Sequence, residues 1–348
     1  MSTKTYPRRN DWQRPLEIFL NRYKTSMDTF FCAEESRQAG EDPIGTGENY
    51  QVYVLVECPT PWTRNAFDSK PIPQNLRALR EEVSQTGLSV RLLLIYNEHL
   101  KQTNSTRCII FRQQEAFSKG YNKQEFQVPN ISNVTPILKE CLLNEILHES
   151  TETQTRDILI CTHGSNDKCC AKYGIPFYKH ALSTVAKLSL NHVRIWQVSH
   201  FGGHRFAPTV IDFPEGRYYA RLDQVSLTSI LTRTGDVQCF NNIYRGWGTL
   251  PHPAQVLERE LILMHGWDWF NYKVACRVLE QSEDGRFNRV ELSFKKPDGS
   301  LSCTQADVVE DERKNLYLMG ECHGMEAEKT PQFFVKNLVN VERVASRI

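Results

Sequence analysis

Three cysteines and two histidines near the middle of the chain have the residue types of a metal centre. Cys161 leads through a loop to the adjacent pair Cys169-Cys170, and His200 and His204 follow later in the chain. Thiolates combined with imidazoles select zinc or iron–sulfur iron over hard cations such as Mg²⁺. Two cysteines with two histidines suit either a tetrahedral zinc ion or a cluster with histidine-ligated iron.

The spacing of these residues only partly distinguishes a zinc ion from an iron–sulfur cluster. Eight residues separate Cys161 from Cys170, whereas structural zinc sites usually hold their cysteines in shorter pairs. The segment between His200 and His204 is Phe-Gly-Gly, and a glycine pair favours a tight loop over a helix. Zinc and an iron–sulfur cluster both remain open. A thiol oxidoreductase is a third alternative, although the C-x-x-C motif is absent.

Two apolar segments are expected to position these side chains. DILICT (157–162) and VRIWQVS (193–199) are both predicted to be apolar, buried strands. Cys161 stands at the carboxyl end of the first, and His200 directly follows the second. Ligands commonly collect at the carboxyl ends of strands in α/β sheets. Two strands of one sheet would therefore bring the cysteine and histidine blocks together.

Strands and helices alternate in two successive stretches, which predicts an α/β (α+β) sheet domain built twice. The first stretch has expected strands at 51–58, 90–96 and 107–112, with helices at 75–85 and 136–147. The second has strands at 157–162 and 193–199, a hairpin over 209–222, and helices at 178–189 and 227–233. A helix at 253–266 and three strand-like runs follow, the last two joined by a turn at 297–300.

These elements divide the chain into four predicted units. A polar leader with a helix from Trp12 to about Lys24 occupies 1–30. An N-terminal half at 31–150 is followed by a second half at 151–250 that contains the candidate site. A C-terminal helix and β appendage at 251–348 is expected to contribute no ligand, although it contains Cys303, Cys322 and His323.

Composition excludes several classes of protein. Of 348 residues, 40% are hydrophobic and 24% charged, which is typical of a soluble globular protein. The net charge of +1 gives no bulk attraction to nucleic acid or anionic membranes. No apolar run reaches the roughly 20 residues of a membrane span, and the N-terminus has no apolar signal region. We expect a cytoplasmic protein. Its 11 cysteines are scattered and odd in number, unlike a disulfide framework.

Two long blocks resemble those of a known family. CTHGSNDKCCAKYGIPFYKH (161–180) and VSHFGGHRFAPTVIDFPEGRYYARL (198–222) are similar to the signature blocks of the sucrase/ferredoxin-like family, also described as thioredoxin-like ferredoxins. EESRQAGEDPIGTG (34–47) and VLVECPTPW (54–62) resemble its N-terminal half. YRGWG (244–248) resembles its bacterial, especially cyanobacterial, members. The resemblance covers roughly residues 25–270.

The resemblance implies two thioredoxin-like halves, of which the second binds a 2Fe–2S cluster through two cysteines and an H-x-x-x-H pair. Carried over to this chain, the ligands are Cys161, Cys170, His200 and His204. The second cysteine falls on Cys170 because the family spacing ends at the later cysteine of the pair. Cys169 departs from the pattern as an additional thiol, and is the alternative ligand.

The resemblance implies an electron-transfer protein rather than a hydrolase, since no pair of carboxylates stands at readable glycosidase positions. A ligating imidazole keeps its second ring nitrogen, so we expect electron uptake to be coupled to proton uptake. The expected partner is an unknown redox protein or a small-molecule reductant, with no nucleic acid. A structural zinc module and a thiol oxidoreductase of thioredoxin-like fold remain the alternatives.

Overall fold

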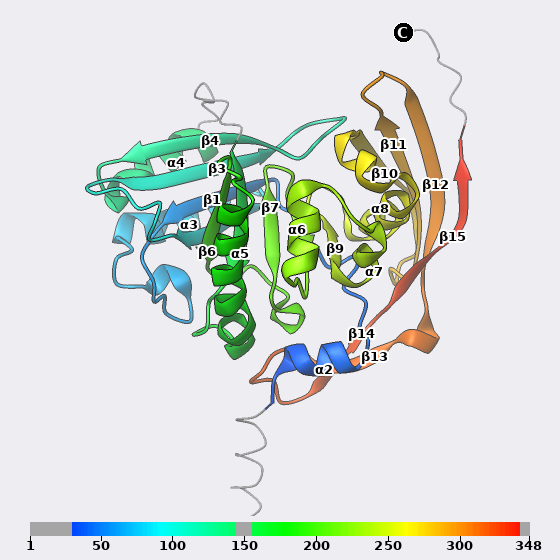
Figure 1. Ribbon diagram of the computed structural model, residues 1–348, viewed down its shortest axis with the longest axis horizontal. Coiled ribbons are helices and arrows are strands. Elements are labelled where there is room, and N and C mark those ends of the chain that lie inside the picture. Colours follow the sequence, from blue (N-terminus) through cyan, green and yellow to red (C-terminus); the bar gives the residue numbers. More distant parts are fainter. Residues whose placement is uncertain (1–29, 144–154, 342–348) are drawn as a thin grey trace, which may run out of the picture.

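The computed structural model describes residues 30–143 and 155–341 (Figure 1). Its largest part is a mixed sheet in the order β4-β3-β1-β2-β6-β5-β7-β8-β9. The strands are β1 (Val52–Glu57), β2 (Val90–Tyr96), β3 (Thr106–Gln113), β4 (Tyr121–Val128), β5 (Arg156–Cys161), β6 (Val193–Val198), β7 (Val210–Phe213), β8 (Arg217–Tyr219) and β9 (Tyr244–Trp247).

The two halves of this sheet have the same topology. In the first half β1 pairs with β2 in parallel and with β3 antiparallel, and β3 pairs antiparallel with β4. In the second half β5, β6, β7 and β8 repeat this order and these directions. The halves join through a short antiparallel pairing of β2 with β6. The predicted α+β fold with two successive sheet-forming halves is confirmed.

Helices cover one face of each half. In the first half α3 (Gln74–Ser84) and α4 (Val134–Leu142) pack on β1 and β3, with Leu76, Leu79 and Val83 of α3 buried at helical spacing. In the second half the cover is α5 (Ile175–Lys187) and α6 (Gln224–Thr232), followed by the short α7 (Phe240–Ile243). Apolar residues cover both faces of β1 and β5, which explains the uninterrupted apolar runs of these strands.

The opposite faces of the two halves share one core. Leu55 of β1 and Ile109 of β3 belong to the same buried cluster as Leu159 of β5 and Trp196 of β6. A buried ion-pair network also joins the halves, since Asp157 accepts from Lys123 at 2.5 Å and from Arg194 at 2.7 Å. The candidate site therefore stands on a scaffold in which the halves are packed together.

The C-terminal part is a helix on a second sheet. α8 (His252–His265) packs against an antiparallel sheet in the order β10-β11-β12-β15. Its strands are β10 (Lys273–Gln281), β11 (Phe287–Lys295), β12 (Leu301–Glu310) and β15 (Phe333–Asn340). The predicted helix, its three following strands and the turn at 297–300 are confirmed; β15 was not predicted. Buried residues of α8, β11 and β12 continue the core of the second half.

A small hairpin near the C-terminal end of the chain packs beside the first helix that the structure describes. β13 (Leu316–Met319) and β14 (Ala327–Thr330) form this hairpin, and it lies beside the N-terminal helix α2 (Cys32–Gln38) (Figure 1). The backbone N–H of Met319 donates to Glu35 of α2 at 2.9 Å. The sequence patterns predicted none of these three elements, nor β4. The helix predicted from Trp12 to Lys24, and the end of the one predicted at 136–147, lie outside the described residues.

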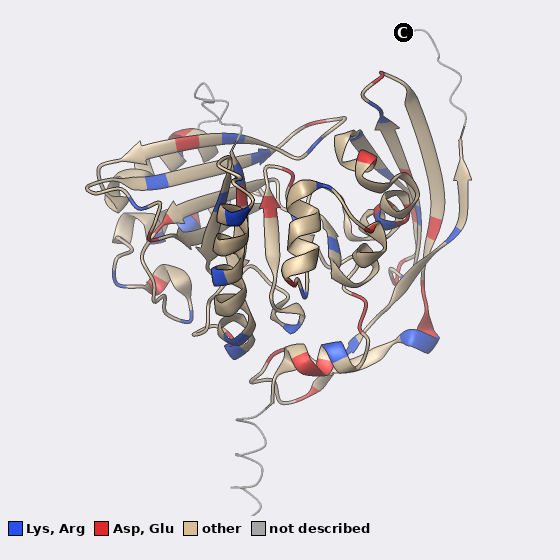
Figure 2. Cartoon of the chain, viewed as in Figure 1, with Lys and Arg blue, Asp and Glu red and all other residues tan. Residues whose placement is uncertain are grey.

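Charges of both signs are interspersed over the same elements (Figure 2). α2, for example, carries Glu34 and Glu35 in its first turn and Arg37 in its last. Within 30–143 and 155–341, no helix combines the length and the apolar character needed to cross a bilayer.

Candidate metal centre

The ends of two parallel strands bring Cys161 close to His200. Cys161 is the last residue of β5 and is in register with Val198, the last residue of β6. The backbone continues this pairing, because the N–H of Thr162 donates to the carbonyl of Val198. His200 follows Val198 by only one intervening residue. The structure confirms the prediction that the cysteine block and the histidine block meet at one edge of the sheet.

A turn after the loop at 162–169 places Cys170 against the carboxyl end of β5. Residues Cys170–Gly174 form a π-helical turn that leads into α5, a geometry often found at functional sites. Gly174 makes this turn possible, because a Cβ built on it would lie 1.9 Å from the carbonyl oxygen of Cys161. Only a residue without a side chain allows the turn to approach the end of β5 so closely.

The histidine block is a loop, as its glycines predicted. Gly202 and Gly203 have φ values of +100° and +74°, in the region that side chains disfavour, and a 3-10 turn follows at His204–Phe206. The carbonyl of His200 accepts from Arg91 at 2.9 Å. The backbone N–H of His200 donates to Nδ1 of His163 at 3.1 Å. These contacts fix the direction in which the His200 ring leaves the backbone.

Three of the four predicted ligands form a compact group. Nδ1 of His200 lies 3.8 Å from Sγ of Cys161 and 3.6 Å from Sγ of Cys170. The donor atoms of these three residues all lie within 4.8 Å of one another. Both cysteines are 1% exposed. The site therefore offers two thiols and an imidazole in a space from which water is largely excluded.

His204 is adjacent to this group but outside it. Its ring centroid lies 5.2 Å from that of His200. Its Nδ1 faces another direction, 3.4 Å from Oδ2 of Asp167 and 3.3 Å from Sγ of Cys32. Burial lowers the pKa of His204 although the nearby Asp167 carboxylate opposes this, and so favours the neutral imidazole that metal binding requires.

The two grouped thiols differ in their acidity. Burial opposes ionisation of Cys161, but hydrogen bonds from Cys170 and His200 outweigh it and hold its pKa well below the ordinary value. The hydrogen bond to Cys161, followed by burial, raises the pKa of Cys170 well above the ordinary value. One thiolate is therefore favoured by the protein itself, whereas two thiolates side by side need a bound cation to offset their charge.

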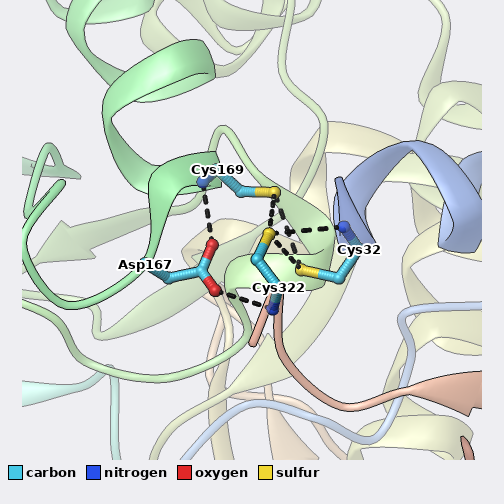
Figure 3. Close-up of side chains that lie close together, drawn as sticks. All are labelled: Cys32, Asp167, Cys169 and Cys322. Atoms are coloured by element: carbon cyan, nitrogen blue, oxygen red, sulfur yellow. Dashed lines mark hydrogen bonds between the residues drawn. The ribbon is translucent and has the colours of Figure 1, made fainter. Parts of the chain in front are cut away.

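The adjacent cysteines Cys169 and Cys170 belong to different groups. Sγ of Cys169 lies 3.6 Å from Sγ of Cys32 and 3.2 Å from Sγ of Cys322 (Figure 3). Together with Asp167 these three cysteines form a second set of potential ligands, all buried. Hydrogen bonds from Cys169 and then Cys32 hold the pKa of Cys322 well below its ordinary value, and hydrogen bonds to Cys169 and Cys322 raise that of Cys32.

The sequence patterns missed Cys32, Asp167 and Cys322 as members of a site. Cys32 and Cys322 stand 290 positions apart and belong to no spaced motif. The one signal pointing to them was the additional thiol of Cys169, which the ligand pattern of the first group did not use. The C-terminal unit, which is expected to contribute no ligand, nevertheless places the sulfur of Cys322 in contact with those of Cys169 and Cys32.

A search of curated proteins finds a partial relative. The chain is 31% identical over 98 residues to altered inheritance of mitochondria protein 32 from Meyerozyma guilliermondii, which covers 26% of this chain and 35% of that protein. The chain thus spans about a third of the length of this curated relative. No solved structure gives a significant match.

A family model described as sucrase/ferredoxin-like matches residues 43–246, more than half of the chain. The matched region includes Cys161, Cys170, His200 and His204, and it excludes Cys32 and Cys322. The chain belongs to the sucrase/ferredoxin-like family.

Proposed function

We propose that the protein is an electron carrier that binds a 2Fe–2S cluster through Cys161, Cys170, His200 and His204. The observation that carries this proposal is the meeting of two buried thiols and an imidazole at the carboxyl ends of β5 and β6. The donor set fits, because thiolates and neutral imidazoles are the ligands of histidine-containing clusters. Such a cluster, when bound, supplies reversible one-electron transfer.

The position of His204 supports its assignment as the fourth ligand. A binuclear group needs donors spread more widely than a single ion does, and His204 stands just beyond the compact group. Its Nδ1 faces Asp167, so Nε2 is the nitrogen we assign to the metal. A carboxylate on the remote nitrogen of a ligating histidine fixes the tautomer and the ring orientation. Asp167 would give His204 this support.

One side of the proposed centre opens to a cavity. His200 lines an open cavity of about 650 Å³, together with Arg64, Arg77, Arg80 and Arg91. Arg91 also donates to the carbonyl of His200. These four arginines outnumber the two carboxylates of the lining, Asp68 and Glu81, so the approach favours a negatively charged partner. We place the redox partner here, as a protein or a small-molecule reductant, and include a cytoplasmic location in the proposal.

A thiol oxidoreductase is the second candidate, favoured by the lowered pKa of Cys161. Reactive cysteines, however, stand in partially exposed positions where a substrate can reach the sulfur. Cys161 and Cys170 are both 1% exposed, and the imidazole of His200 lies against them. Burial of this kind suits ligands better than nucleophiles.

The visible spectrum and metal content of the purified full chain test the proposal. We expect a brown protein that contains iron and acid-labile sulfide and loses its colour reversibly on reduction. A colourless protein whose zinc is lost completely when Cys161 and Cys170 are replaced would instead show that this centre is a structural zinc site. A protein free of metal and able to form a Cys161–Cys170 disulfide would favour the oxidoreductase.

Proton coupling is expected to depend on His200 rather than His204. Nδ1 of His200 faces the two sulfurs, which leaves Nε2 as the free ring nitrogen, and the ring borders the open cavity. Added negative charge beside this imidazole raises its affinity for a proton. Between the pKa values of the two redox states, the reduction potential should fall by about 59 mV per pH unit. Film voltammetry from about pH 6 to 10 would measure this slope.

Two matched variants distinguish the contributions of His200 and His204 to the pH dependence of the reduction potential. His200→Cys should remove most of the slope and lower the potential, because a thiolate adds negative charge and has no titrating nitrogen. His204→Cys should lower the potential and keep the slope, since Nδ1 of His204 is directed to Asp167. A flat potential in the unmodified protein would exclude proton coupling, and an unchanged slope in His200→Cys would assign it to another group.

A further inference from the structure

Three thiols from distant parts of the chain meet at a second place, formed by Cys32, Cys169 and Cys322. Cys32 begins α2, Cys169 precedes the π-helical turn, and Cys322 lies between β13 and β14. Their sulfur atoms are separated by 3.6 Å (Cys32 to Cys169), 3.2 Å (Cys169 to Cys322) and 3.5 Å (Cys322 to Cys32). All three side chains point toward a common centre (Figure 3).

These separations suit three ligands of one ion. A disulfide holds its sulfurs about 2.05 Å apart, far less than is seen here. A tetrahedral zinc ion with Zn–S bonds of about 2.3 Å holds its sulfurs about 3.8 Å apart. The observed triangle is slightly tighter than this, and every edge is a direct contact between sulfurs. A multinuclear cluster would hold the sulfurs further apart, so a single ion is the better fit.

Asp167 completes the set with an oxygen donor. Its Oδ1 accepts from the backbone N–H of Cys169 at 2.8 Å, and its Oδ2 accepts from that of Cys322 at 3.0 Å. The carboxylate is 2% exposed, and its donor atom lies within 4.8 Å of all three sulfurs. His204 contacts two members of the set but does not belong to it. Three thiols and a carboxylate thus enclose one position.

The surroundings favour negative charge at this place. The backbone N–H of Cys32 points to the sulfur of Cys322 at 3.5 Å, a contact that stabilises a thiolate. The ammonium groups of Lys168 and Lys172 lie 5.0 Å and 3.4 Å from the ring centre of Phe31, the residue before Cys32.

We propose that Cys32, Cys169, Cys322 and Asp167 bind one zinc ion, at a structural site distinct from the Cys161–Cys170–His200 group. Soft thiolates select zinc over hard divalent cations, and four protein donors around a buried ion are the form of a closed structural site. The proposal does not depend on the function proposed above, because the two sets of ligands share no residue.

The ion would connect three segments that lie far apart in the chain. It would tie α2 and the β13–β14 hairpin to the loop that carries the candidate cluster ligands. Cys169 is next to Cys170 in the chain, and Asp167 also faces His204. The zinc site would therefore hold α2 and the β13–β14 hairpin in place. It would also help to position Cys170 and His204, two of the proposed cluster ligands.

Metal analysis of matched cysteine variants tests the proposal. The full chain, purified from zinc-supplemented cells, should contain about one zinc per chain in addition to iron. Cys322→Ser should lose the zinc and retain the iron. Cys276→Ser is the control, because Cys276 is a half-buried thiol of β10 outside both groups, and should retain both metals. Full zinc in Cys322→Ser, or a wild type from the same cells that contains no zinc, would overturn the proposal.

A cobalt experiment covers the case in which Cys322→Ser does not fold. Co²⁺ in place of zinc in the otherwise unaltered chain should give the thiolate-to-cobalt absorption of a tetrahedral site with three sulfur ligands. The absorption should persist at full strength in a Cys161→Ser, Cys170→Ser double variant, which removes the first group and its iron. Loss of the absorption in that double variant would assign the ion to the first group and refute the second site. Failure of the cluster proposal alone would appear instead as a wild type without iron.

Discussion

Cys170→Ser is expected to abolish iron binding and visible absorption, whereas Cys169→Ser is expected to leave both in place. The two cysteines are adjacent in sequence, but their sulfurs face different groups. Sγ of Cys170 lies 3.6 Å from Nδ1 of His200, and Sγ of Cys169 lies 3.2 Å from Sγ of Cys322. A serine hydroxyl is a poor substitute for a thiolate on iron, so the loss in Cys170→Ser should be close to complete.

Zinc content should show the opposite pattern in the same pair of variants. Cys169→Ser removes one of the three thiols of the second group, so it should lose zinc and retain iron. Cys170→Ser should retain zinc and lose iron. Iron, sulfide and zinc analysis with visible absorption would measure both, and circular dichroism would show that each variant is folded. Loss of iron in Cys169→Ser with retention in Cys170→Ser would transfer the ligand role to Cys169.

The edge that carries the candidate cluster ligands could be predicted from local sequence patterns. The mainly apolar residues of β5 and β6 indicate neighbouring strands, and Cys161 and His200 stand at or just beyond their carboxyl ends. Gly202 and Gly203 likewise indicated a loop between the histidines. In each case the signal is contained in a few consecutive residues, which is why the sequence was sufficient.

The second group had no comparable signal. Cys32 and Cys322 are brought together by the packing of α2 on the β13–β14 hairpin, across nearly the whole chain. No spacing rule connects residues that far apart. α2 is short and largely polar, and β13 and β14 have only four residues each, so neither element gave a clear periodicity. Only three-dimensional packing places these residues together.

Gly174 is the position at which a single methyl group should do most damage to the candidate cluster site. A Cβ at this residue would lie 1.9 Å from the carbonyl oxygen and 3.0 Å from the carbonyl carbon of Cys161. Both atoms are backbone at the end of β5, where pairing with β6 and β7 fixes their positions. The clash can be relieved only if the turn at Cys170–Gly174 moves away from the strand, which separates the sulfurs of Cys170 and Cys161.

Gly174→Ala should therefore lower the free energy of unfolding by about 3 kcal/mol, at the upper end of what overpacking of a core usually costs. Its iron content should also fall. Urea unfolding and iron analysis would measure the two effects. Gly320→Ala is the matched control, because its Cβ would meet only the flexible carboxylate of Glu328, at 3.4 Å, and its φ is not positive. That variant should remain close to wild type in stability and iron content. Wild-type stability and iron in Gly174→Ala would show that the close approach of the turn to β5 is not needed to hold Cys170 beside Cys161.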